Sequence, residues 1–182
     1  MLRLAMADAP AEDRVIHHPN REKGGSKATK AGTILLLLAS AALTAIITIG
    51  GWKDLEGAQV ISIFFIIVFL LMAFFVARWN RGVLPLAAAF AIVLLVFAAI
   101  AASGWFDRDA NGYDNPGLPP GLLGLLTVIL IPVEFLLIVF AMRGFSQKWN
   151  VEVEMSREEY DRIHRGDGGG GRGGYQYAQP QS

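Results

Sequence analysis

The residue best placed for unusual chemistry in this sequence is Glu134, the one acidic side chain within a long apolar stretch. It precedes Arg143 by nine residues, which corresponds to about 13 Å along a helix. The apolar stretches contain no Lys, Arg or His that could pair with it, so desolvation in hydrocarbon favours the neutral acid. Pro132, two residues earlier, lacks a backbone N–H and should bend the helix beside this carboxyl group.

Small and hydroxyl-bearing residues recur at helical spacing in two of the apolar stretches, and membrane helices pack through such faces. The members are Thr33, Ser40, Thr44 and Thr48 in the first stretch, and Gly121, Gly124, Thr127 and Glu134 in the fourth. We therefore expect these two stretches to pack together, with Glu134 hydrogen-bonded to Thr44 or Ser40. Thr127 completes the expected intramembrane polar site. Three roles are open: a protonated acid that stabilises the bundle, a proton or cation site, and a contact to another subunit.

A second set of candidate ligands lies in the acidic segment that begins at Asp107 and reads D-R-D-A-N-G. It matches the first half of a calcium loop, with oxygen ligands at Asp107, Asp109 and Asn111. The twelfth position is Leu118, where a calcium loop needs a bidentate glutamate. The motif is therefore partial. It predicts weak extracellular calcium binding, with a polar turn rich in Asp and Asn as the alternative, and no other cofactor is expected.

The elements that must position these side chains are four long apolar blocks. The chain has 182 residues, of which 53% are hydrophobic and 18% charged, and its charges fall between the blocks. The blocks span residues 33–50, 58–77, 83–106 and about 117–142. Roughly 20 residues of helix cross a hydrocarbon core of about 30 Å, and inside lipid only a helix satisfies its own backbone. The sequence predicts an all-α fold, an integral membrane four-helix bundle over residues 33–143.

Basic residues predict how the bundle is threaded, because they concentrate on the cytoplasmic side of membrane proteins. Two of them, Lys53 and Arg108, fall on one side of the predicted bundle. The remaining basic residues fall on the other side: Arg3, Arg14, Arg21, Lys23, Lys27, Lys30, Arg78, Arg81, Arg143, Lys148, Arg157, Arg162, Arg165 and Arg172. We expect a plasma (inner) membrane protein with both termini in the cytoplasm. The four tryptophans, at positions 52, 79, 105 and 149, fall at the helix ends and should lie at the headgroup level.

The polar ends of the chain flank the bundle. Residues 1–32 are basic and rich in breakers, and residues 166–182 are rich in glycine, so both are expected to be disordered cytoplasmic tails. Between the bundle and the C-terminal tail, residues 144–165 form a juxtamembrane segment. Within it, residues 151–154 alternate as a short strand would, and Ser156 with Glu159 has the spacing of a capping box that opens a helix through about Arg165.

Several function classes are excluded by what the sequence lacks. It contains no cysteine, no phosphate-binding loop and no ordered Ser-His-Asp set, and its one Arg with two Tyr in the tail is too little for nucleic-acid binding. We expect a non-enzymatic accessory or scaffold subunit of a larger membrane complex. The alternative is a small oligomeric transporter or channel that uses Glu134. The expected partners are the lipid bilayer and a membrane protein or further copies of this chain.

Overall fold

The computed structural model describes residues 14–55, 57–108 and 117–166. The elements along the chain are β1 (Arg14–His17), α2 (Pro19–Glu22), α3 (Gly24–Gly50), a 3₁₀ turn (Trp52–Asp54), α4 (Gln59–Ala77), α5 (Val83–Asp107), α6 (Pro120–Ser146), β2 (Val153–Ser156) and α7 (Arg157–Gly166). Two compact units emerge from these elements. Residues 20–151 form the bundle, and the second unit combines both ends of the chain. Its described elements are β1, β2 and α7, and we call it the end module.

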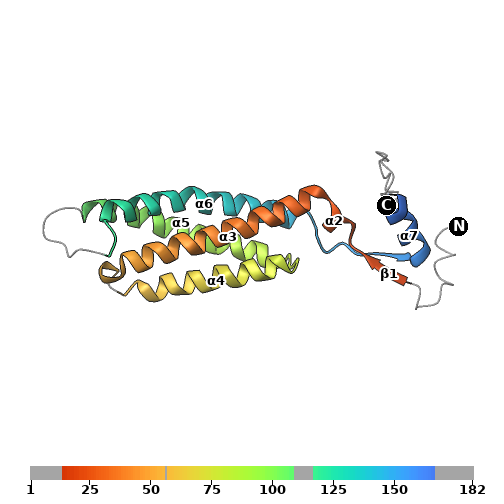
Figure 1. Cartoon of the computed structure of the whole chain (residues 1–182), viewed down its shortest axis with the longest axis horizontal. Helices are drawn as coiled ribbons and strands as arrows, with labels where there is room; N and C mark the ends of the chain where they lie inside the picture. Colours follow the sequence, from red (N-terminus) through yellow and green to blue (C-terminus); the bar gives the residue numbers. More distant parts are fainter. Residues whose placement is uncertain (1–13, 56, 109–116, 167–182) are drawn as a thin grey trace. The chain divides into compact units, whose positions relative to one another are not determined.

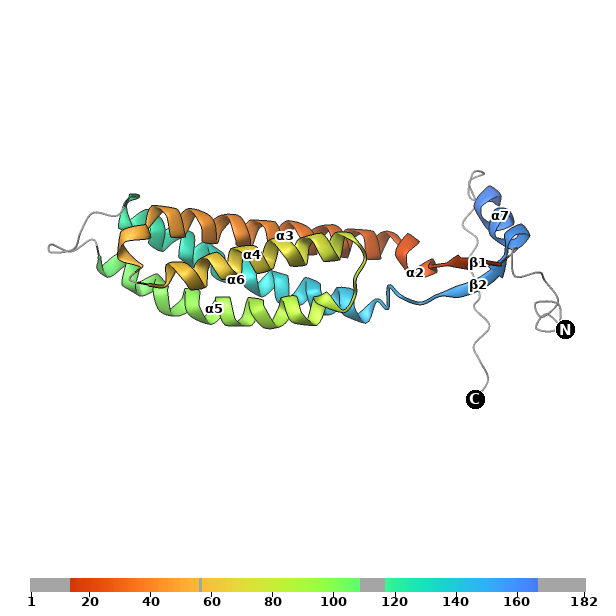
Figure 2. The same cartoon turned by 90° about the horizontal axis from the view of Figure 1, so that it is seen from below.

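The bundle consists of α3, α4, α5 and α6, which run alongside one another (Figures 1 and 2). Each of the four is long and apolar enough to cross a bilayer, and only 28–33% of each spanning window is buried inside the protein. Large apolar side chains cover the outside, and Ile49, Val60 and Ile100 are 70–74% exposed. Exposing such a surface to water is unfavourable in free energy, whereas contact with hydrocarbon is not. The chain is therefore a multi-pass membrane protein, as the sequence predicts.

Helix packing within the bundle is uneven. α6 packs extensively against α5 and also against α3, and α3 packs against α4, whereas α4 and α5 share few contacts. The core contains Leu37 of α3, Phe69 of α4, Leu84 of α5 and Leu137 of α6, all of them 0% exposed. The predicted packing of the first apolar stretch against the fourth is confirmed by the α3–α6 contact.

The end module joins segments from the two ends of the chain. β1 and β2 pair antiparallel, with Arg14 opposite Ser156 and His17 opposite Val153. The face that carries His17 and Met155 is buried, each residue being 8% exposed, and the His17 ring meets the Tyr160 ring of α7 at 5.7 Å between centroids. Because β1 precedes the four spans and β2 follows them, this pairing requires both segments to lie on the same side of the membrane.

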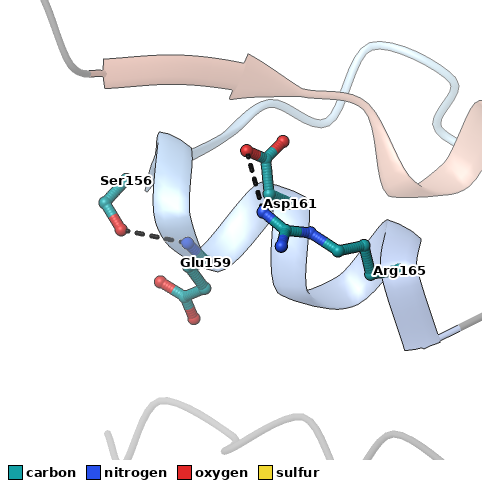
Figure 3. Close-up of polar contacts among 4 residues, drawn as sticks. All are labelled: Ser156, Glu159, Asp161 and Arg165. Atoms are coloured by element: carbon teal, nitrogen blue, oxygen red, sulfur yellow. Dashed lines mark hydrogen bonds and ion pairs between the residues drawn. The ribbon is translucent and has the colours of Figure 1, made fainter.

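Helix α7 begins as its capping box predicts. The backbone N–H of Glu159 donates to the Ser156 hydroxyl at 3.3 Å, as Figure 3 shows. One turn later, Arg165 and Asp161 form an exposed ion pair at 3.8 Å. The cap pairs one of the free backbone N–H groups at the helix start, so α7 begins directly after Ser156, as the sequence predicts.

The structure departs from the expected boundaries at the N-terminal end. Residues 14–32 are not disordered: they contain β1, α2 and the first turns of α3, which begins at Gly24 rather than at residue 33. The buried faces of these turns are polar, because Ser26 and Thr29 are each 3% exposed. An apolar-block criterion therefore misses them. The strand near residues 151–154 lies at Val153–Ser156 instead. The expected disorder of residues 1–13 and 167–182 falls outside the described residues.

Candidate functional site

Glu134 lies at the centre of the α3–α6 interface and is 0% exposed. α6 continues past Pro132 to Ser146, so the proline does not end the helix. Ser40 of α3, also 0% exposed, faces the carboxyl group of Glu134 without a hydrogen bond of standard geometry. Periodicity places both residues on the polar face of their helix, but it leaves either Ser40 or Thr44 as the partner of Glu134.

The polar groups around Glu134 are not paired as expected. The Ser40 hydroxyl and both carboxyl oxygens of Glu134 lack a hydrogen bond of standard geometry among the described residues, and so does the Thr44 hydroxyl. The expected hydrogen bond from Thr44 to Glu134 is therefore absent. Three polar side chains are buried with unused hydrogen-bonding capacity in one region of the bundle. Burying polar groups without hydrogen bonds costs folding free energy, so such groups are candidates for a functional site.

The other hydroxyl groups of the interface are used by their own helices. Thr127 Oγ1 donates to the Leu123 carbonyl at 2.8 Å, and Thr48 Oγ1 donates to the Thr44 carbonyl at 2.6 Å. The structure therefore brings Ser40 to Glu134 but directs Thr127 away from it. Thr44 and Thr127 instead line a neighbouring pocket.

This pocket, which we call the lateral pocket, has a volume of about 330 Å³. Its lining comes from all four spanning helices and includes Leu130, which lies one turn from Glu134 on α6. Glu134 itself is not part of the lining. The sequence gives no signal for this pocket, because it depends on the sparse contact between α4 and α5.

A basic and aromatic cluster lies at the end of the bundle where α3 starts and α6 ends. The Trp79 and Trp149 rings meet edge to face with 5.3 Å between centroids. The Lys30 ammonium lies 4.1 Å from the centre of the Trp79 ring, and Arg21 Nε donates to the Trp149 carbonyl at 3.1 Å. Further basic side chains at this end are Lys23, Lys27, Arg78, Arg81, Arg143 and Lys148. We call this end the basic rim.

The tryptophans do not all behave as headgroup anchors. Trp52 is 50% exposed, as expected, but Trp105 and Trp149 are 2% and 0% exposed. Trp149 Nε1 donates to Gln147 Oε1 at 3.0 Å, and Gln147 Nε2 donates to Thr29 Oγ1 at the same distance. Trp149 therefore packs inside the end of the bundle, where protein covers its ring. A repeated basic-Trp-Asn triplet at residues 78–80 and 148–150 is the sequence signal for this cluster.

The partial calcium motif cannot be assembled from the described residues. Asp107 is exposed at the last position of α5, and Asp109 and Asn111 lie outside the described part of the chain. Within residues 14–55, 57–108 and 117–166, no group of three or more His, Cys, Asp or Glu side chains could hold a metal ion. Calcium binding at this loop stays a prediction from the sequence.

Comparison with known proteins adds no assignment. No protein-family model, curated protein or solved structure matches the chain.

Proposed function

We propose that this chain is a non-enzymatic accessory or scaffold subunit of a larger membrane complex. In this proposal it lies in the plasma (inner) membrane and both of its termini are in the cytoplasm. The observation that carries the proposal is the end module. It builds a small domain outside the spans from segments before and after them, and it exposes Ile16 to 58% on the face opposite His17. An exposed apolar side chain beside an open strand edge adds apolar area to a contact with another protein.

The end module also has a means of binding. Its sheet has two strands among the described residues, and a two-stranded sheet alone is marginally stable. A partner that adds an extended segment to an open strand edge would stabilise the module and gain main-chain hydrogen bonds. The bundle supports a structural role as well, because Glu134 is wholly buried and does not line the lateral pocket.

The basic rim supports the proposed orientation. At the end of the bundle where α3 starts, eight Lys and Arg residues surround one acidic residue, Glu22, over residues 20–30, 78–81 and 143–150. Basic residues of this density stay on the cytoplasmic side during insertion and are attracted to anionic lipids. With four spans between the two ends of the chain, the proposed orientation puts both ends on that same side.

Co-purification from native membranes in a mild detergent tests the accessory role. We expect a partner at a fixed stoichiometric ratio, and we expect Ile16→Asp to reduce its recovery at least fivefold while the bundle keeps its melting temperature. The matched control is Arg162→Asp, which changes an exposed residue of α7 in the same module. If the chain purifies alone and Ile16→Asp changes no association, the accessory role is contradicted.

A transporter or channel is the second candidate, because Ser40, Thr44 and Glu134 hold unused hydrogen-bonding capacity deep in the bundle. Such groups can carry a proton or a cation. Reconstitution into sealed vesicles tests this alternative. If Glu134→Gln assembles normally but loses proton or ion flux that the unmodified protein shows, Glu134 belongs to a path. Equal flux in the variant would remove this candidate.

A further inference from the structure

The lining of the lateral pocket reaches the outer surface of the bundle on α4 and α5. Three of its large apolar side chains are exposed there: Ile61 of α4 at 50%, and Phe97 and Ile100 of α5 at 45% and 70%. These two helices share few contacts. A molecule dissolved in the bilayer can therefore enter sideways, through a mouth formed by apolar side chains.

The inner wall of the pocket is different in character. It carries the hydroxyl-bearing residues Thr44 and Thr48 from α3 and Thr127 from α6, and Ser62 of α4 also lines the pocket and donates to the Ala58 carbonyl. Thr48 and Thr127 have donated their protons to backbone carbonyls, so in this arrangement they offer only lone pairs. Thr44 is 6% exposed, and its hydroxyl has no hydrogen-bond partner among the described residues. Thr44 thus carries a buried hydroxyl without a partner at the wall of a predominantly apolar pocket.

We propose that the lateral pocket binds a lipid with a long apolar body and one hydroxyl group, and that this hydroxyl hydrogen-bonds to Thr44. A hydroxyl accepts the Thr44 proton and can donate its own to a neighbouring lone pair, whereas a hydrocarbon chain satisfies neither group. A buried donor that stays unpaired is costly, so the pocket favours a ligand that pairs it over one that fills space alone.

The size and lining of the pocket fit such a ligand. Its volume of about 330 Å³ lies at the lower end of the range for small-molecule sites, which is about 300–1,000 Å³. The lining is predominantly apolar with a few placed polar groups, as in most ligand sites. Binding of the lipid hydroxyl depends on the pocket alone, so this proposal does not rest on the accessory role of the chain.

Two probes that differ only at the polar end test this inference. We would titrate the purified full-length protein with dodecan-1-ol and with its methyl ether, and follow binding by native mass spectrometry and by the melting temperature. Dodecanol is expected to bind roughly tenfold more tightly, because the ether oxygen can only accept. Thr44→Val should reduce this preference to less than about twofold while keeping the shape of the side chain.

Matched variants locate the effect. Thr33→Val removes an equally buried hydroxyl that donates to Thr29 and lies outside the pocket lining, so the preference for the alcohol should persist. Ala98→Leu places a larger side chain in the pocket and should abolish binding of both probes. Equal affinity for alcohol and ether in the unmodified protein would show a site for plain acyl chains and overturn the inference. Binding that survives both Thr44→Val and Ala98→Leu, with the preference unchanged, would also overturn it.

Discussion

The indole of Trp149 lies edge-on to the indole of Trp79, and this contact closes the bundle at the basic rim. Trp149 is 0% exposed, whereas Trp79 also carries the Lys30 ammonium over its ring. Both Trp79 and Lys148 have a positive φ, at 61° and 48°, a conformation that most side chains avoid. The backbone is therefore strained next to both rings, and the packing of the rings must offset the free-energy cost of that strain.

The first prediction concerns this pair. Trp149→Ala should destabilise the bundle by about 3–5 kcal/mol, because it leaves a large cavity beside Gly144 and Leu84. Thermal unfolding in detergent measures the loss. Trp52→Ala is the control, since Trp52 lies at the opposite end and is 50% exposed. Similar melting temperatures for the two variants would show that Trp149 does not hold the bundle together.

A second prediction uses two glycines with opposite surroundings. At Gly51, an added Cβ would collide with the ring of Trp105, which is 2% exposed and cannot move aside, so Gly51→Ala should cost about 1–3 kcal/mol. At Gly121 of α6, an added Cβ meets nothing within 4 Å. Gly121→Ala should be neutral or stabilise the helix by up to about 1 kcal/mol. Unfolding of the two variants, measured side by side, decides whether the end of α3 packs tightly against Trp105.

The third prediction tests whether Ser40 and Glu134 act as a pair. A double-mutant cycle with Ser40→Ala and Glu134→Leu should give a coupling energy of about 0.6 kcal/mol, the average for polar contacts between membrane helices. A cycle of Glu134→Leu with Thr127→Val should be additive, because the Thr127 hydroxyl donates to its own helix. Coupling to Thr127 that exceeds coupling to Ser40 would contradict the site geometry.

Orientation is open to a direct labelling experiment, because the natural sequence has no cysteine. Lys53 and Ser146 are both exposed and lie at opposite ends of the bundle. In intact cells, a membrane-impermeant maleimide should label Lys53→Cys, and it should label Ser146→Cys only after lysis. The reverse pattern would place the basic rim outside the cell and refute the proposed threading.

The fifth prediction addresses the cap of α7. Ser156→Ala removes the acceptor for the Glu159 N–H, which should cost about 1 kcal/mol of local stability. Amide exchange in the first turn of α7 should accelerate about fivefold, with no change in the spanning helices. Ser146→Ala, outside the end module, provides the comparison. Unchanged exchange in α7 would mean that the cap does not limit its opening.

Much of the bundle is predictable because lipid imposes a simple rule on sequence. The predicted blocks at 58–77 and 83–106 match α4 and α5 to within one residue at each end. Hydropathy does not predict where α3 begins, because its first turns bury the polar residues Ser26 and Thr29. Lys27 and Lys30 of the same turns are exposed or half-buried. A helix that leaves the hydrocarbon no longer needs apolar residues all round, so hydropathy stops reporting it.

The site was predictable only in part. Spacing along each helix places Ser40, Thr44 and Glu134 on buried faces, because a helical period fixes a face. It does not fix the relative height of two helices, and that height decides that Ser40 meets Glu134 while Thr44 opens onto the lateral pocket. The β1–β2 pair was likewise hidden, because its strands are short and far apart in sequence.

The distance along the chain between β1 and β2 also sets an order of events during synthesis. Arg14 leaves the ribosome long before its partner Ser156, so the sheet cannot close until every span between them has been made. A chain that has inserted an odd number of spans leaves the two strands on opposite sides of the bilayer, where they can never meet. Closure of this small sheet thus reports that an even number of spans has been inserted, and any factor that recognises the finished sheet would reject molecules with an odd number.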